Sequence, residues 1–259
     1  MLLEIIKGAV NTSRTWEYIK RIDALKAKNP DARILFVVPE QFSYSAEKLF
    51  VSYFGGTGLN NIEVMTMSRM AERYLNRIRK NYLTKAGKAV LIQKAINDIN
   101  KEENAYGGCS DKPGFANTVS DTITELKRCL ITPQMLIECA EKTKNNMLKS
   151  KLSSIAEIYS RYQEMNLASF YDAEEDLTRL SILIENEKIF EDAYVFVDDY
   201  VEFYPQHYRV LESIIRTSKA LTLTLPIDEN DLENSKIPKD TLRRLKRICE
   251  KNSCNFLET

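Results

Sequence analysis

Residues 2–15, LLEIIKGAVNTSRT, hold the pattern that decides the fold. Residues 2–6 form a short run of strand-forming side chains, and the run ends near Gly8. Apolar residues then recur at helical spacing over 14–28, so the pattern predicts a helix there. A strand, a polar loop and a helix in this order begin a βα unit.

Further strand candidates suit a series of such units. Residues 33–38 (RILFVV) form a continuous apolar run, which is typical of a strand buried on both faces of a parallel sheet. Shorter apolar runs lie at 62–65, 193–197 and 220–225. Beyond residue 226 the chain is polar and then basic, and it shows no evident final element.

Between residues 68 and 188 the sequence is patterned for helices and offers no convincing strand. This stretch is too long for a simple crossover connection. We therefore predict an α/β fold in which residues 1–70 and 190–259 form a parallel-sheet core. Residues 71–189 form a mostly helical insertion.

The 37 basic and 37 acidic residues give a net charge of zero, but they are unevenly placed. Residues 1–100 carry 16 basic and 9 acidic groups, whereas residues 151–200 carry 4 basic and 12 acidic groups. A basic segment at 69–94 also contains Tyr74 and Tyr82, which suits either a groove for single-stranded DNA or a solvated helix face. The acidic stretch 172–176 has two possible docking sites, basic groups of this chain or those of a partner.

Several classes of protein are disfavoured by what the sequence lacks. No apolar run approaches the roughly 20 residues that span a bilayer, and no secretory signal is recognisable, so we expect a cytoplasmic protein without membrane contact. The single histidine, His207, leaves little room for zinc ligation or a Ser-His-Asp triad. Five cysteines without a C-x-x-C pair indicate reduced thiols rather than a disulfide framework, and we predict no metal site.

The loop after the first strand has the P-loop pattern with two substitutions. Gly8 begins the pattern and Thr15 supplies the hydroxyl for Mg²⁺. Ser13 stands where glycine is expected, and Arg14 stands where lysine is expected. A serine Cβ and a long planar guanidinium make a poorer phosphate cradle, so we predict a degenerate nucleotide site without hydrolysis. The alternative is an ordinary strand-to-helix turn capped by Thr12 or Ser13.

Residues 194–199 (YVFVDD) form an apolar strand that delivers two carboxylates at its carboxyl end, where open α/β sheets bind ligands. This stretch resembles a Walker B strand. Asp198 would then face Mg²⁺, and Asp199 would replace the glutamate that activates water, with a side chain one methylene shorter. The alternative is that the two aspartates only end a strand and begin a turn.

The order of these features is more specific than any one of them. After the P-loop-like turn come FVVPEQFS at 36–43, VMTMSR at 64–69, the helical insertion, YDAEEDL at 171–177 and the Asp198 strand. This order is similar to that of the first domain of a superfamily-1 helicase. Over nearly the whole chain, the sequence resembles the N-terminal helicase-like region of the B subunit of AddAB/RexAB-type helicase-nucleases.

The resemblance implies a function in double-strand-break repair and recombination. In that family the B subunit keeps an inactivated helicase fold, pairs with a translocating A subunit, and scans the exported single strand for a recombination hotspot sequence. By resemblance, Gln41, Ser43 and Arg69 would contact DNA, and the basic segment adds Arg73 and Arg77. We therefore expect a non-translocating scaffold that binds single-stranded or duplex DNA and has no catalytic residue of its own.

The resemblance also implies parts that this chain does not contain. The second helicase domain and the nuclease domain, with its cysteine-ligated iron–sulfur cluster, would belong to a longer chain of which this is an N-terminal piece. ATP and Mg²⁺ would bind weakly or not at all. Two other hypotheses stay open: a competent P-loop ATPase that tolerates Ser13 and Arg14, and a helical adaptor unrelated to nucleic acid in which the P-loop pattern is a coincidence.

Overall fold

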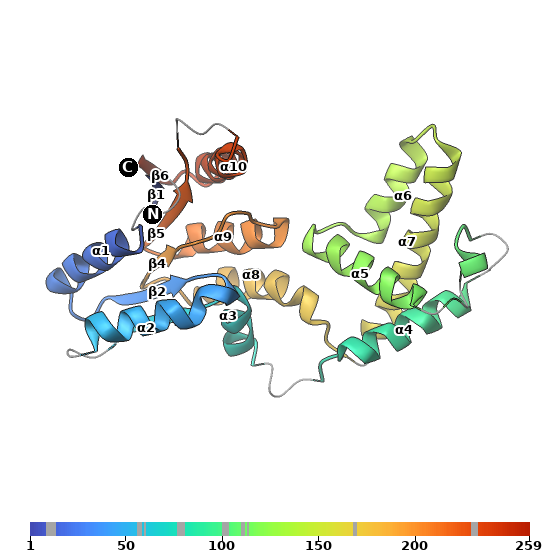
Figure 1. Cartoon of the computed structure of the whole chain (residues 1–259), viewed down its shortest axis with the longest axis horizontal. Coiled ribbons are helices and arrows are strands. Elements are labelled where there is room, and N and C mark those ends of the chain that lie inside the picture. The colour runs from blue at the N-terminus through green and yellow to red at the C-terminus, as the bar shows by residue number, and fades with distance from the viewer. Residues whose placement is uncertain are drawn as a thin grey trace. The chain divides into compact units, whose positions relative to one another are not determined.

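The computed structural model describes residues 1–8, 14–55, 59, 61–76, 81–99, 104–109, 112, 114–167, 170–228 and 233–259. The chain divides into two compact units (Figure 1). Unit 1 consists of Met1–Leu75 and Leu177–Thr259, and unit 2 is Asn76–Asp176. Within the described ranges, none of the helices is long and apolar enough to cross a membrane.

Unit 1 is built on a six-stranded parallel sheet with the strand order β3-β2-β4-β5-β1-β6. The strands are β1 (Leu2–Gly8), β2 (Arg33–Val37), β3 (Ile62–Met65), β4 (Ala193–Val197), β5 (Ala220–Pro226) and β6 (Asn255–Glu258). The predicted α/β fold with a parallel-sheet core of the P-loop type is confirmed.

Helices cover both faces of this sheet, because neighbouring residues of a strand point to opposite sides. Phe36 of β2 belongs to one apolar cluster with Ile22 and Phe50, whereas Val37 belongs to a second cluster on the other face. Double-sided burial explains why β2 reads as a continuous apolar run. The helices of unit 1 are α1 (Arg14–Lys28), α2 (Ser43–Phe54), α3 (Met67–Tyr74), α8 (Asp176–Glu187), α9 (Pro205–Thr217) and α10 (Lys236–Lys251).

The boundaries between the units differ from the predicted ones. Helix α8 was expected in the insertion, but Leu180 and Ile184 of α8 are fully buried in a core cluster of unit 1. Met70 of α3 is buried in the same cluster. Helical periodicity shows that a helix has an apolar face, but not which core buries that face, so the sequence alone could not place these two helices.

The end of the chain corrects two predictions. Helix α10 and the edge strand β6 form a final α-β element, although the exposed and half-buried residues of β6 give it no apolar run. Between them the chain reverses at Ser253 (φ 52°), which brings the Cα atoms of Cys249 and Cys254 to 5.1 Å, and the two cysteines form a disulfide. The expectation of reduced thiols is therefore wrong for this pair, whereas Cys109, Cys129 and Cys139 are free.

Unit 2 is helical, apart from one parallel bridge between Tyr82 and Tyr171 in its described part. Its apolar core joins Ile92, Ile123 and Tyr162 from three different helices. The helices are α4 (Lys85–Asp98), α5 (Phe115–Arg128), α6 (Pro133–Lys142) and α7 (Asn146–Leu167), with the 3-10 turns η3 (Gly107–Cys109) and η4 (Ala173–Glu175).

A buried charge network closes unit 2. The ammonium group of Lys127 lies 2.8 Å from Asp172 Oδ2 and 2.5 Å from Glu175 Oε1. Tyr162 donates to the same Oδ2 at 2.8 Å, and Lys88 donates to Thr124 Oγ1 at 2.7 Å while its Nζ lies 3.6 Å from Asp172. The acidic stretch thus docks within the chain. Lys88, counted in the basic segment, is buried and does not belong to a DNA-facing surface.

We expect this network to make unit 2 sensitive to acid. Burial opposes ionisation of Asp172, but Lys127 and Lys88 outweigh it and lower the pKa of Asp172 to about 2. Since the folded pKa lies below the ordinary value, the carboxylate contributes stability above about pH 4, and this contribution is lost as the pH falls through about 2. Asp172→Asn should lower the free energy of unfolding at neutral pH by about 3 kcal/mol and remove this pH dependence.

Urea denaturation between neutral pH and about pH 2 measures both effects. Asp98→Asn is the matched control, because Asp98 pairs with Arg161 at the surface and should contribute less than about 1 kcal/mol. An Asp172→Asn protein with the wild-type pH profile would contradict the assignment.

Candidate functional site

The candidate site lies at the carboxyl edge of the parallel sheet, where all the strands of unit 1 end on the same side. Asp198 directly follows β4, Thr15 lies in the first turn of α1 after β1, and Thr224 lies near the end of β5. Strand β5 lies between β1 and β4. This order brings together three residues that are far apart in the sequence.

Asp198 is the centre of the site. Its side chain is buried, with only 1% exposed. Thr15 Oγ1 donates a hydrogen bond to Asp198 Oδ2 at 2.9 Å, and Thr224 Oγ1 donates to Oδ1 at 2.5 Å. The backbone N–H of Asp199 also donates to Oδ1, at 2.9 Å. Both carboxylate oxygens are therefore satisfied, as a buried charge requires.

Tyr18 holds the first turn of α1 over the end of β4. Its hydroxyl donates to the carbonyl of Val197 at 2.6 Å, and its ring packs edge-on against Phe36 and Phe196. Tyr18 lies three residues after Thr15 and so on the same face of the helix. This anchor fixes the threonine hydroxyl above the aspartate.

Thr224 and Tyr18 were missed in the sequence analysis. A signal for Thr224 exists in ALTLTL at 220–225, because a polar residue in a buried strand needs a hydrogen-bond partner. That signal does not name the partner, which comes from another strand.

The donor set fits Mg²⁺ in part. Hydroxyl and carboxylate oxygens are hard ligands of the kind that Mg²⁺ binds, so Thr15 and Asp198 are the residues that would hold the ion. Gly8 ends β1 as the pattern requires, and Asp199 is half-buried with a left-handed backbone (φ 59°). Ser13 and the side chain of Arg14 lie outside the described part of the chain, so the phosphate cradle itself stays a prediction.

A second group of predicted residues meets at the ends of β2 and β3. Gln41 lies in the 3-10 turn η1 (Glu40–Phe42), and Ser43 begins α2. Arg69 lies in the first turn of α3, and its Nη1 donates to Ser43 Oγ at 3.1 Å. Arg69 also forms an exposed ion pair with Glu47. Two segments that follow neighbouring strands are thus joined by direct side-chain contact.

Exposed aromatic side chains accompany this group. Phe42 is 40% exposed and Tyr44 is 77% exposed, on either side of Ser43 in the chain. Aromatic faces open to solvent are platforms on which unpaired bases stack. The sequence analysis overlooked both residues, although they stand within the stretch FVVPEQFSYS.

The rest of the basic segment is engaged in other contacts. Arg73 Nη1 lies 2.7 Å from Glu63 Oε2, and Arg77 lies outside the described residues. Tyr74 accepts a hydrogen bond from Arg33 at 2.7 Å, and Tyr82 donates to Asp176 at 3.0 Å. These tyrosines therefore support their own units, and the structure offers Phe42 and Tyr44 as the exposed rings instead.

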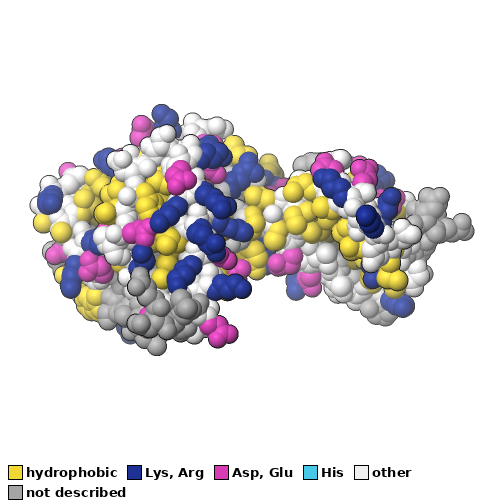
Figure 2. All heavy atoms as spheres, turned by 90° about the horizontal axis from the view of Figure 1, so that it is seen from above, with side chains coloured by type: hydrophobic (Ala, Val, Ile, Leu, Met, Phe, Trp, Pro, Cys, Tyr) yellow, Lys and Arg dark blue, Asp and Glu magenta, His cyan; other side chains and the backbone are white. Residues whose placement is uncertain are grey.

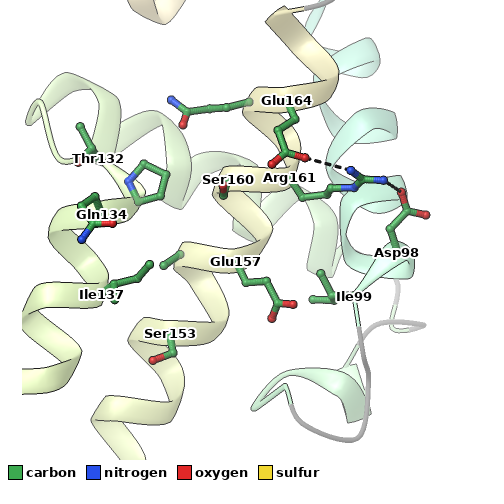
Figure 3. A pocket seen from close by; sticks show the side chains of 13 residues that line it. Asp98, Ile99, Thr132, Gln134, Ile137, Ser153, Glu157, Ser160, Arg161 and Glu164 are labelled. Carbon is green, nitrogen blue, oxygen red and sulfur yellow. Dashed lines mark hydrogen bonds and ion pairs between the residues drawn. The ribbon is translucent and has the colours of Figure 1, made fainter.

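Unit 2 also contains a groove of about 810 Å³, shown in Figure 3. Arg161 extends across its rim, with its guanidinium 3.3 Å from Asp98 and 3.0 Å from Glu164. The other labelled side chains are mainly polar and come from α6, α7 and the segments beside them. None of the described residues predicted for the site lines this groove, so it is separate from the candidate site.

The parallel sheet, with a threonine of the first helix bonded to the aspartate that ends β4, is that of a P-loop-type α/β protein. The particular family follows from a match over nearly the whole chain. The family model described as "ADDB, N-terminal" matches residues 5–259, and the chain belongs to that family.

The relatives agree with this assignment, and three of them are B subunits of ATP-dependent helicase/deoxyribonucleases. The protein from Clostridium tetani is 34% identical over 231 residues, which cover 87% of this chain and 20% of the relative. The protein of the same name from Clostridium novyi is 30% identical over 231 residues, with 88% and 20% covered. That from Caldanaerobacter subterraneus subsp. tengcongensis is 27% identical over 266 residues, with 100% and 23% covered. The chain spans about a fifth of the length of these relatives.

The hydrogen bond from Thr224 should be measurable as stability. Thr224→Val keeps the shape of the side chain but removes a donor from the buried carboxylate of Asp198, so the free energy of unfolding should fall by about 1 to 3 kcal/mol. Thr222→Val, two residues earlier on the same strand, is the control and should change stability by less than about 1 kcal/mol. Urea denaturation measures both, and equal losses in the two variants would remove Asp198 from the centre of the site.

Proposed function

We propose that this chain is the helicase-like, DNA-binding part of the B subunit of a helicase/deoxyribonuclease and acts in DNA double-strand-break repair and recombination in the cytoplasm. In this proposal it scans single-stranded DNA without moving along it by itself. A partner subunit of the AddA/RexA type supplies ATP-driven translocation. Family membership and the names of the relatives support the repair function, and they favour it over a helical adaptor.

The contact between Arg69 and Ser43 carries the DNA-binding part of the proposal. A guanidinium and a hydroxyl are 3.1 Å apart on the surface of unit 1, with Gln41 in the preceding turn. Arginine pairs with guanine edges or phosphate, and an amide or hydroxyl bonds to base edges. Phe42 and Tyr44 add exposed rings for stacking, which favours an unpaired strand as the ligand.

Glu47 gives this proposal a two-sided test. The Arg69–Glu47 pair is solvent-exposed, so it is worth at most about 1 kcal/mol and is readily exchanged for a DNA phosphate. Glu47→Gln should therefore raise the affinity for single-stranded DNA several-fold, because it removes an anion that competes with DNA for Arg69. Arg69→Ala should lower the affinity roughly tenfold, as expected for the loss of one charged contact.

Fluorescence anisotropy with a mixed-sequence oligonucleotide at several salt concentrations measures both effects. Arg161→Ala in unit 2 is the control, because Arg161 is also an exposed arginine held by two carboxylates. If Glu47→Gln and Arg69→Ala change the affinity in the same direction, this surface is not the DNA site.

We propose further that the ATP site is degenerate. The two substitutions in the P-loop pattern, Ser13 and Arg14, support this, as does the short carboxylate Asp199 beside Asp198. The Thr15–Asp198 contact supports the second candidate function, a competent ATPase, because these residues would hold Mg²⁺. The ion would neutralise phosphate charge at that edge of the sheet.

Calorimetry separates the two candidates. A degenerate site should release no heat with ATP and Mg²⁺ at micromolar to millimolar concentration, and Thr15→Ala should leave DNA binding unchanged. Micromolar binding together with DNA-stimulated hydrolysis that Thr15→Ala abolishes would establish the competent ATPase. Thr15→Ser, which keeps the hydroxyl, is the control.

A further inference from the structure

Helix α10 carries a second charged surface that the proposed function does not use. Its 16 residues, KIPKDTLRRLKRICEK, contain seven basic and two acidic side chains. The basic residues are Lys236, Lys239, Arg243, Arg244, Lys246, Arg247 and Lys251. At 3.6 residues per turn they fall on one arc of the helix, about 160° wide.

The opposite side of α10 is fixed in the core of unit 1. Pro238, Thr241, Leu245 and Cys249 are buried and follow one another at helical spacing. The helix therefore has no choice of face, and the basic arc points to solvent. Figure 2 views the molecule from the side on which α10 lies in Figure 1, and it shows Lys and Arg side chains gathered on this face.

Few carboxylates compensate this charge. Arg243 pairs with Asp240, Lys246 pairs with Glu258, and Lys251 Nζ lies 3.1 Å from Glu212 Oε1. These pairs are at the surface and exchange readily for other anions. Among the described residues, Lys236, Lys239 and Arg247 have no carboxylate within ion-pair distance.

We propose that this basic arc of α10 binds the phosphate backbone of duplex DNA without reading its sequence. Lys239, Arg243 and Arg247 stand four residues apart in one row, about 6 Å from one to the next along the axis. With Lys236 and Lys251 at its ends, the arc presents cations over about 22 Å of helix. A duplex carries one phosphate charge per about 1.7 Å of its axis, so several phosphates lie within reach of this length.

The composition of the arc favours a duplex over other polyanions. Helix α10 has no aromatic residue, so it offers no surface on which unpaired bases stack, unlike the region around Phe42 and Tyr44. A protein partner needs apolar anchors, and Ile237 is the one large apolar side chain exposed on α10. An anionic membrane also needs an apolar face to insert, but that face of α10 is buried against the sheet.

The test compares two triple variants of the 259-residue chain. Lys239→Gln with Arg243→Gln and Arg247→Gln removes the central row of α10. Lys20→Gln with Lys28→Gln and Lys48→Gln removes the same charge from exposed sites on α1 and α2, whose cores lie on the other face of the sheet. Anisotropy with a mixed-sequence duplex of about 20 base pairs, repeated at several salt concentrations, gives the affinity and its salt dependence.

The α10 variant should bind the duplex at least tenfold more weakly, and the slope of log affinity against log salt should fall by about 2 to 3, since each phosphate contact releases about 0.9 ion. The α1 and α2 variant should change affinity less than twofold. A charge-preserving α10 variant, Lys239→Arg with Arg243→Lys and Arg247→Lys, should bind like the parent, and circular dichroism should show that all three variants are folded.

The other outcomes overturn the proposal. Equal losses in the two neutralised variants would mean that only net charge matters. Unchanged duplex binding, with loss of binding to polyglutamate, would assign the arc to an acidic protein. Equal loss of oligothymidylate binding would remove the preference for duplex. The single-strand site fails by a different result, that of Arg69→Ala, so the two proposals are tested separately.

Discussion

A buried carboxylate at the end of β4 is the constraint on which unit 1 depends. Asp198 is almost completely buried, and such a charge is tolerated only when hydrogen bonds replace water. Its donors come from α1, from β5 and from the backbone after β4, three segments that the chain separates widely. They meet only when β5 lies between β1 and β4 and when Tyr18 holds α1 in place. The strand order and the site are therefore the same arrangement.

Unit 2 meets the same physical demand in another way. Its buried carboxylate, Asp172, is satisfied by Lys127, Tyr162 and the backbone of η4. Several charges that make the first hundred residues basic and the middle of the chain acidic are thereby neutralised inside one unit. A count of charges along the sequence thus describes the surface poorly, because pairing is decided by contacts between distant segments.

The two charged surfaces of unit 1 differ in chemistry. Around Arg69 a single guanidinium lies among a hydroxyl, an amide and exposed rings, which suits contacts to individual bases. On α10 many cations stand without rings, which suits a uniform line of phosphates. A helicase-like domain that held duplex and single strand on separate surfaces would keep both forms of DNA in place while a partner supplied movement.

The sequence by itself determined the parallel α/β class, the helical insertion and the five strands with apolar runs, because burial on both faces leaves a pattern that local residues carry. It also marked Thr15 and Asp198 through their spacing from strand ends. Only the tertiary structure decided that Thr224 completes the site, that α8 belongs to the sheet, that β6 exists and that Cys249 pairs with Cys254. Each of these depends on a partner elsewhere in the chain, and periodicity or composition in one segment holds no information about that partner.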